Sequence, residues 1–153
     1  MNSLDHERYM RRAIELAGNV PELPFAAVIV DSQTGHVVAE GWNQTARHPI
    51  WHGEMVALHA LTESAVPVAT TSLVLYTTAE PCPMCQGAIL WSGLGGVVFG
   101  TSIRTLQQLG WRQIDILAEE VIRRSPGWHC NLLGGVLEQD CDALFERVGM
   151  RPD

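Results

Sequence analysis

Two short motifs rich in metal-binding side chains most restrict what this chain can fold into. The first is His52-Gly53-Glu54, and the second, twenty-seven residues further on, is Pro81-Cys82-Pro83-Met84-Cys85. A His-x-Glu arises by chance roughly 0.4 times in a chain of this composition, whereas the second motif arises on the order of 0.005 times. Each motif follows an expected strand or loop and opens an expected helix. The two motifs together, rather than either one alone, therefore indicate a functional site.

The spacing and position of the cysteines indicate a metal site. Cys82 and Cys85 are three residues apart at an expected helix start, so both sulfur atoms project to one side of the helix. A helix N-terminus has free amide groups and the positive end of the helix dipole, which lower the pKa of a thiol. His52 can supply a third ligand from the start of the other helix. Zn²⁺ prefers thiolate and imidazole ligands, and three protein ligands leave a fourth position for water, as in catalytic zinc sites.

Glu54 stands two residues from His52, which suits a proton carrier beside the metal. Its carboxylate can lie over the bound water without becoming a ligand. It is expected to take a proton from that water, pass it to a ring nitrogen and later protonate a departing amine. Zinc-bound hydroxide would attack the amino-bearing ring carbon, because the metal lowers the pKa of its water to about 7.

Three other interpretations of the same residues stay open. Cys82 and Cys85 could form a redox pair, which would leave Glu54 without a role. They could instead belong to a structural zinc site with His52 and a fourth ligand such as Cys130 or His59. A non-catalytic, zinc-stabilised binding module would also account for the ligands.

The remaining pattern predicts an α/β fold in one domain over residues 1–153. Apolar runs rich in β-branched residues indicate buried strands, and they alternate with segments of helical periodicity. Such alternation implies helices on both faces of a sheet. Strands are expected at 25–30, 36–41, 72–77, 95–99 and 131–133, and helices at 3–17 (capped by Ser3), 53–64, 83–91, 103–109, 116–124 and 137–148.

Charge and hydropathy argue against nucleic-acid and membrane partners. The net charge is −7, and all ten basic residues are arginines scattered along the chain. Nucleic-acid binding depends largely on neutralising phosphates, and no basic run is present for it. There is no run of eighteen apolar residues and no apolar stretch like that of a signal peptide near the N-terminus, so we expect a cytoplasmic protein.

Several stretches resemble the cytidine and deoxycytidylate deaminase superfamily, and within it the branch of bacterial guanine deaminases and tRNA adenosine deaminases. The H-x-E…P-C-x-x-C arrangement is the signature of zinc deaminases that act on bases. The resemblance covers about residues 5–100, and the tail fits more loosely. The matching stretches are Leu23–Val30, Gly41-Trp42-Asn43, His52-Gly53-Glu54, Glu80–Cys85 and Val97-Val98-Phe99-Gly100. Gly53 departs from the pattern, since alanine is commoner there in the family.

This resemblance implies a three-layer α/β/α sandwich with a five-stranded mixed sheet, a zinc site and a homodimer. It implies that Phe25 and Asn43 line the base pocket. Trp91, at the end of Ala88-Ile89-Leu90-Trp91, resembles the aromatic residue that guanine deaminases favour there. The family's tail also supplies an acidic residue that reads the purine, for which Glu119 is favoured over Asp115 and Glu120.

The predicted function is therefore zinc-dependent hydrolytic deamination of a purine base, with guanine converted to xanthine and ammonia. A tRNA adenosine-to-inosine deaminase is the alternative with the same chemistry. Other aminated rings or nucleosides, including cytosine and triazines, are not excluded by the motifs.

Overall fold

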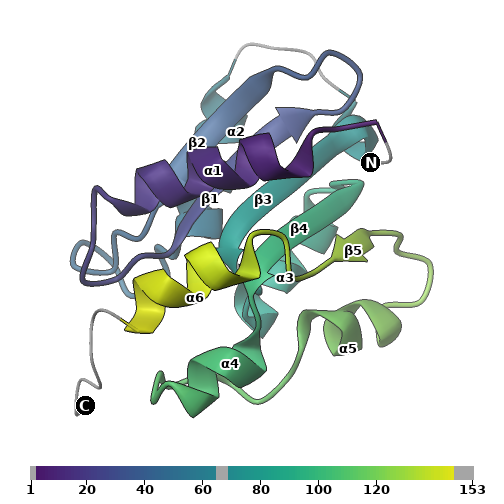
Figure 1. Cartoon of the computed structure of the whole chain (residues 1–153). Coiled ribbons are helices and arrows are strands. Elements are labelled where there is room, and N and C mark those ends of the chain that lie inside the picture. Colours follow the sequence, from purple (N-terminus) through teal and green to yellow (C-terminus); the bar gives the residue numbers. More distant parts are fainter. Residues whose placement is uncertain (1–2, 65–68, 147–153) are drawn as a thin grey trace.

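The computed structural model describes residues 3–64 and 69–146 and contains a five-stranded sheet between two layers of helices (Figure 1). The fold class predicted from the sequence is confirmed. No helix in the described part of the chain is long and apolar enough to cross a membrane. The strands are β1 (Ala26–Asp31), β2 (Val37–Trp42), β3 (Leu73–Ala79), β4 (Gly96–Thr101) and β5 (Asn131–Leu133); the helices are α1 (His6–Ala17), α2 (Gly53–Glu63), α3 (Pro83–Trp91), α4 (Ile103–Gln108), α5 (Ala118–Arg123) and α6 (Glu138–Glu146), with a 3₁₀ turn at Thr70–Ser72.

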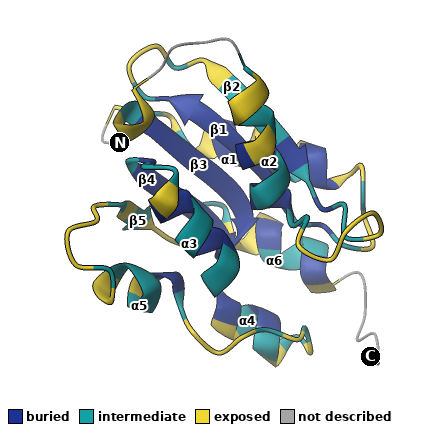
Figure 2. Ribbon diagram, turned by 180° about the vertical axis from the view of Figure 1, so that it is seen from behind, coloured by how far each residue is buried: buried dark blue, intermediate teal, exposed yellow. Residues whose placement is uncertain are grey.

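The sheet has the order β2-β1-β3-β4-β5. β1 pairs antiparallel with both β2 and β3, whereas β3, β4 and β5 run parallel to one another. Every residue of β1, β3 and β4 is buried, because helices cover both faces of these strands (Figure 2). This matches the continuous apolar runs of their sequences, which are typical of strands buried on both sides.

Alternating side chains of the central strands supply two separate cores. Val28, Val30 and Tyr76 face α1 and α6, and they pack with Met10 of α1. The residues between them face α2 and α3, and they pack against Ala57 of α2 and Ile89 of α3. Because α2 and α3 cover the same face of the sheet, their N-termini approach each other at one edge.

That edge collects the ends of four neighbouring strands. In the observed register Ala26, at the start of β1, lies opposite Trp42, at the end of β2. Ala79, at the end of β3, lies opposite Thr101, at the end of β4. The segments that precede β1 and follow β2, β3 and β4 therefore meet at the same edge of the sheet.

The first helix starts later than the sequence pattern predicted. It begins at His6, and its N-cap is Asp5 rather than Ser3, since the Asp5 carboxylate accepts a hydrogen bond from the backbone N–H of Arg8 at 3.1 Å. Aspartate is among the strongest N-cap residues, so either residue could satisfy the local pattern. The helix expected over 116–124 is shorter in the structure, where α5 spans Ala118–Arg123. Residues 147–148 of the last expected helix lie outside the described residues.

Candidate active site

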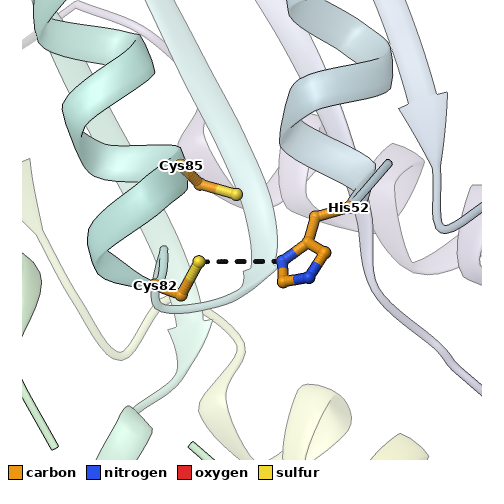
Figure 3. A group of neighbouring side chains, drawn as sticks. All are labelled: His52, Cys82 and Cys85. Carbon is orange, nitrogen blue, oxygen red and sulfur yellow. Dashed lines mark hydrogen bonds between the residues drawn. The ribbon is translucent and has the colours of Figure 1, made fainter. Parts of the chain in front are cut away.

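The three predicted metal ligands come together at the N-termini of α2 and α3. His52 is the N-cap residue of α2, Cys82 is the N-cap residue of α3, and Cys85 lies in the first turn of α3. Their ligand atoms all lie within 4.8 Å of one another. Figure 3 shows the three side chains pointing toward a common point, with the Nδ1 atom of His52 at 3.6 Å from the Sγ atom of Cys82.

The donor set fits zinc. Two thiolates and one imidazole are the ligands that Zn²⁺ prefers, and three protein ligands correspond to a catalytic rather than a structural site. Among the described residues the group consists of His52, Cys82 and Cys85, and it includes neither Cys130 nor His59 as a fourth ligand. The zinc cofactor expected from the sequence is therefore supported by the geometry.

The electrostatics of the cluster favour a cation at this point. Hydrogen bonding from Cys85 and from His52 lowers the pKa of the Cys82 thiol to about 4. Pairing with Cys82 and burial raise the pKa of the Cys85 thiol. The pKa of His52 is also raised, first by its hydrogen bond to Cys82. A cysteine that ligates zinc is deprotonated, so zinc binding would release the proton of any thiol that is still protonated.

Glu54 is buried beside these ligands, in the first turn of α2. Only 4% of the residue is exposed. Burial raises the pKa of its carboxyl group to about 7, and the negative charge of Cys82 acts in the same direction. A carboxyl group that titrates near neutral pH can both accept and return a proton at that pH.

A cavity of about 220 Å³ opens onto His52, Cys82 and Glu54. A second hollow of about 340 Å³, named the outer hollow to distinguish it from this inner cavity, adjoins it and shares His52, Cys82, Arg112 and Gln113. The other residues that line the inner cavity are Leu23, Phe25, Asn43, Thr45, Glu80 and Trp111, and those that line the outer hollow are Pro49, Met84 and Ile114.

Asn43 lies in the wall of the inner cavity with its side-chain amide held in one orientation. Its Oδ1 atom accepts hydrogen bonds from the backbone N–H of Thr45 at 3.1 Å and from the Thr45 hydroxyl at 2.8 Å. Because a backbone N–H can only donate, the oxygen of the amide must face Thr45. The amide nitrogen of Asn43 is thereby left to donate to a bound molecule.

Phe25 also lies in the cavity wall, where it belongs to an aromatic cluster. Its ring packs edge-to-face with Trp111 at a centroid distance of 5.4 Å and lies 4.9 Å from Phe145. The indole N–H of Trp111 donates to the backbone carbonyl of Phe145 at 3.2 Å. These contacts hold the apolar side of the cavity in place.

The other expected pocket residues lie elsewhere. Trp91 is 80% exposed at the end of α3 and packs edge-to-face on Trp128 at 4.9 Å. Glu119 is exposed in the first turn of α5, and Glu120 pairs with Arg123 and Arg124. Among the described residues, the cavity wall contains none of the three acidic candidates.

Sequence reasoning did not single out several residues of the cavity wall. Thr45 follows Asn43 by two positions, a spacing typical of an Asx turn that could have indicated its contact. Glu80 was recognised as part of a matching stretch without a role of its own. Trp111, Arg112 and Gln113 lie in a segment between short helices that carries no motif, so no local signal marks them.

Comparison with known proteins places the zinc motifs in a family. The model of the cytidine and deoxycytidylate deaminase zinc-binding region matches residues 3–101. The chain is 33% identical over 129 residues to a guanine deaminase of Bacillus subtilis, which covers 76% of this chain and 81% of that protein. It is 30% identical over 144 residues to a tRNA-specific adenosine deaminase of the same organism, which covers 91% of this chain and 85% of that protein.

The fold has close structural neighbours as well. A solved structure of a guanine deaminase from Nitrosomonas europaea superimposes with a TM-score of 0.75. The match covers 93% of this chain and 83% of that chain, at 24% sequence identity. This similarity supports the fold.

Proposed function

The chain belongs to the cytidine and deoxycytidylate deaminase family and is a zinc-dependent deaminase, and from that premise we propose that its substrate is a free purine base, guanine in the first place. The reaction replaces the ring C–NH₂ by C=O and consumes one water molecule, so that guanine gives xanthine and ammonia. The observation that carries the proposal is the position of Glu54, which is buried in the wall of a small cavity beside the three candidate zinc ligands.

We propose that His52, Cys82 and Cys85 hold the zinc ion. When bound, zinc supplies a Lewis acid that makes water a nucleophile at neutral pH. Glu54 accepts one proton from the attacking water and delivers it to a ring nitrogen of the base. It then takes the second proton, from the hydroxyl group that has been added to the ring carbon, and passes it to the amino group, which leaves as ammonia while C=O forms. Burial raises the pKa of the Glu54 carboxyl group, and a raised pKa suits a group that must both accept and return a proton near neutral pH.

Asn43 and Phe25 hold the base in this proposal. The amide nitrogen of Asn43 donates to an oxo group or an unprotonated ring nitrogen of the substrate, because its oxygen is engaged by Thr45. Phe25 supplies an apolar contact to the ring. The expected roles of Trp91 and Glu119 in substrate binding stay predictions. The proposed reaction assigns no step to either residue.

The size of the inner cavity favours a free base over a nucleoside. Its volume of about 220 Å³ is smaller than the roughly 300–1,000 Å³ of sites that take drug-sized ligands. A planar ring system alone suits such a space. The curated guanine deaminase relative is consistent with this choice.

A tRNA adenosine deaminase is the alternative, and the outer hollow is the observation that favours it. This hollow adjoins the inner cavity through His52, Cys82 and the wall residue Arg112, and it gives room for a sugar and a neighbouring nucleotide. The net charge of −7 and the lack of lysine disfavour it, because nucleic-acid affinity depends on neutralising phosphates.

We further propose a homodimer, which would cover exposed apolar surface. Trp91 and Trp128 form an exposed aromatic pair, and exposed aromatic residues are enriched at protein–protein interfaces. Sedimentation velocity of the wild type and of Trp91→Ser tests this proposal. A shift of the variant toward the monomer is expected, and a monomeric wild type at micromolar concentration would contradict it.

Ammonia release by the zinc-loaded protein tests the substrate. The panel should contain guanine, adenine, cytosine, guanosine, cytidine, adenosine and a tRNA anticodon stem-loop. Turnover of guanine far above the others is expected. Activity confined to the stem-loop would retain the zinc chemistry and establish the alternative.

A further inference from the structure

Glu80 is a buried carboxylate that the proposed reaction does not use. It is 6% exposed and lines the inner cavity. It stands two positions before the proposed zinc ligand Cys82. Its backbone N–H donates to the carbonyl of Thr101 at 2.7 Å, which holds its main chain at the end of the β3–β4 pairing. A buried charge is costly unless hydrogen bonds compensate it, so its partners indicate what it does.

Both oxygens of Glu80 accept hydrogen bonds from helix N-termini. Oε2 accepts from the backbone N–H of Ile103, the first residue of α4, at 2.9 Å. Oε1 accepts from the backbone N–H of Ala118, the first residue of α5, also at 2.9 Å. The N-cap residue of α5, Leu117, makes no side-chain cap hydrogen bond, so Glu80 supplies the acceptor that this helix start otherwise lacks.

The segment between these two anchored residues forms one wall of the cavity. Residues 109–117 connect α4 to α5, and within them Trp111, Arg112 and Gln113 line the cavity. One carboxylate therefore holds both ends of the stretch 103–118, which contains α4 and this wall segment. The same residue stands two positions before Cys82, on the loop that presents the metal ligand.

We propose that Glu80 is a positioning residue that fixes the distance between the metal centre and the substrate-binding wall at residues 111–113. It does so without touching the reacting atoms, through the starts of α4 and α5. Loosening this anchor should therefore weaken substrate binding and leave the metal site intact. The kinetic part of the test rests on the proposed deaminase function.

Two variants weaken this anchor from opposite sides, one at the carboxylate and one at a backbone donor. Glu80→Gln keeps the shape of the side chain, but its amide group can accept from only one of the two backbone N–H groups. Ala118→Pro removes the N–H donor and leaves Glu80 unchanged. Proline is tolerated at the first position of a helix, and Leu117 has the extended conformation (ψ 153°) that a following proline requires.

Asp31→Asn is the matched control. Asp31 is also a buried carboxylate, 7% exposed, and it accepts from the backbone N–H of Gln33 at 3.0 Å and the hydroxyl of Thr34 at 2.9 Å. It lies at the opposite end of β1 from the candidate active site. Its replacement should lower stability without a specific effect on substrate binding.

The readouts are zinc content, KM and kcat, and backbone hydrogen exchange without substrate. In Glu80→Gln and Ala118→Pro we expect KM to rise about tenfold, the effect of losing one hydrogen bond to a charged group, with zinc retained and kcat changed less. Exchange should increase over residues 103–118 in both variants. In Asp31→Asn it should increase around the β1–β2 turn instead.

An unchanged KM in both variants would overturn the proposal. So would a joint loss of kcat, zinc and folded fraction that matches the behaviour of Asp31→Asn. If the wild-type protein turns over no base at all, the proposed function is wrong, but this result does not test the role of Glu80. The exchange pattern then still decides whether Glu80 anchors the wall, because that measurement needs no substrate.

Discussion

The Nδ1 atom of His52 lies 3.6 Å from the Sγ atom of Cys82, although thirty positions separate them in the chain. Both residues are N-caps, and neither uses its side chain to cap its own helix. The helices α2 and α3 pack on the same face of the sheet, so their N-termini present these side chains to each other. The structure thus leaves both side chains free to bind a metal.

Replacing Glu54 with glutamine should lower turnover strongly while zinc stays bound. The amide has nearly the same shape but cannot carry the proton, and proton transfer by a positioned side chain contributes about 10²- to 10⁴-fold in rate. We expect kcat to fall by about that factor, measured as ammonia release, with zinc content by metal analysis equal to that of the wild type. Retained turnover in Glu54→Gln would support a different proton carrier.

The metal site could be predicted from the sequence because local rules place its residues. The cysteines lie three apart at a helix start, and the helix rule puts both sulfur atoms on one side. Pro83 at the first helical position and the buried strand before it mark where α3 begins. The positions of the two cysteines then follow from their spacing, whereas His52 reaches them only through the packing of α2 and α3 on the sheet.

The pocket was harder to predict because its wall is assembled from distant segments. Phe25 and Asn43 flank paired ends of β1 and β2, so strand pairing brings both into the cavity. Trp91 follows an apolar run, and periodicity does not say whether the last residue of a helix is covered. Glu80 acts through contacts 23 and 38 residues away, which no local pattern reveals.

Gly53→Ala should destabilise the protein, although alanine is commoner at this position in the family. A Cβ atom at Gly53 would lie 2.7 Å from the carbonyl oxygen of Phe25 and 3.0 Å from the Cα atom of Ala26. Both neighbours are backbone atoms at the start of a buried strand and cannot move aside easily. Overpacking of this kind costs about 1–3 kcal/mol in the free energy of unfolding.

Gly87→Ala is the matched control for Gly53→Ala. Gly87 lies inside α3, and a Cβ atom there would have no neighbour within 4 Å. Since alanine is favoured over glycine by about 1 kcal/mol in a helix interior, this variant should be slightly more stable than the wild type. Chemical denaturation of the two variants should therefore give shifts of opposite sign, and equal shifts would refute the steric explanation.

Thr45→Val should weaken substrate binding through Asn43. Valine has the shape of threonine but lacks the hydroxyl that donates to Asn43 Oδ1 at 2.8 Å. The amide would keep the backbone N–H of Thr45 as its partner and lose part of its fixed orientation. A net hydrogen bond is worth about 0.5–1.5 kcal/mol, so KM should rise about two- to twelvefold with little change in kcat.

Thr45→Ser provides the rescue for this test, because serine retains the hydroxyl. Its KM should return close to the wild-type value, while Asn43→Ala should raise KM at least as much as Thr45→Val. A serine variant as impaired as the valine variant would show that packing of the methyl group, rather than the hydroxyl, matters.

The contact between His6 and Tyr76 should make stability fall on acidification. The Nδ1 atom of His6 lies 2.8 Å from the hydroxyl of the fully buried Tyr76, and burial lowers the pKa of His6 below its usual 6.5. Between the folded and unfolded pKa values the unfolded chain binds more protons, so stability increases with pH in this window. The contribution of His6 is complete above pH 6.5 and is lost as the pH falls toward the folded-state value.

Thermal unfolding of metal-free wild type and His6→Gln between pH 7.5 and 5 measures this contribution. Glutamine can still accept from the Tyr76 hydroxyl but does not titrate, so the variant should lose less in Tm over this range than the wild type. Metal-free protein is used because acid also releases zinc from cysteine and histidine ligands. Parallel pH profiles for the two proteins would show that His6 does not contribute, and the acid sensitivity would then have to come from other groups.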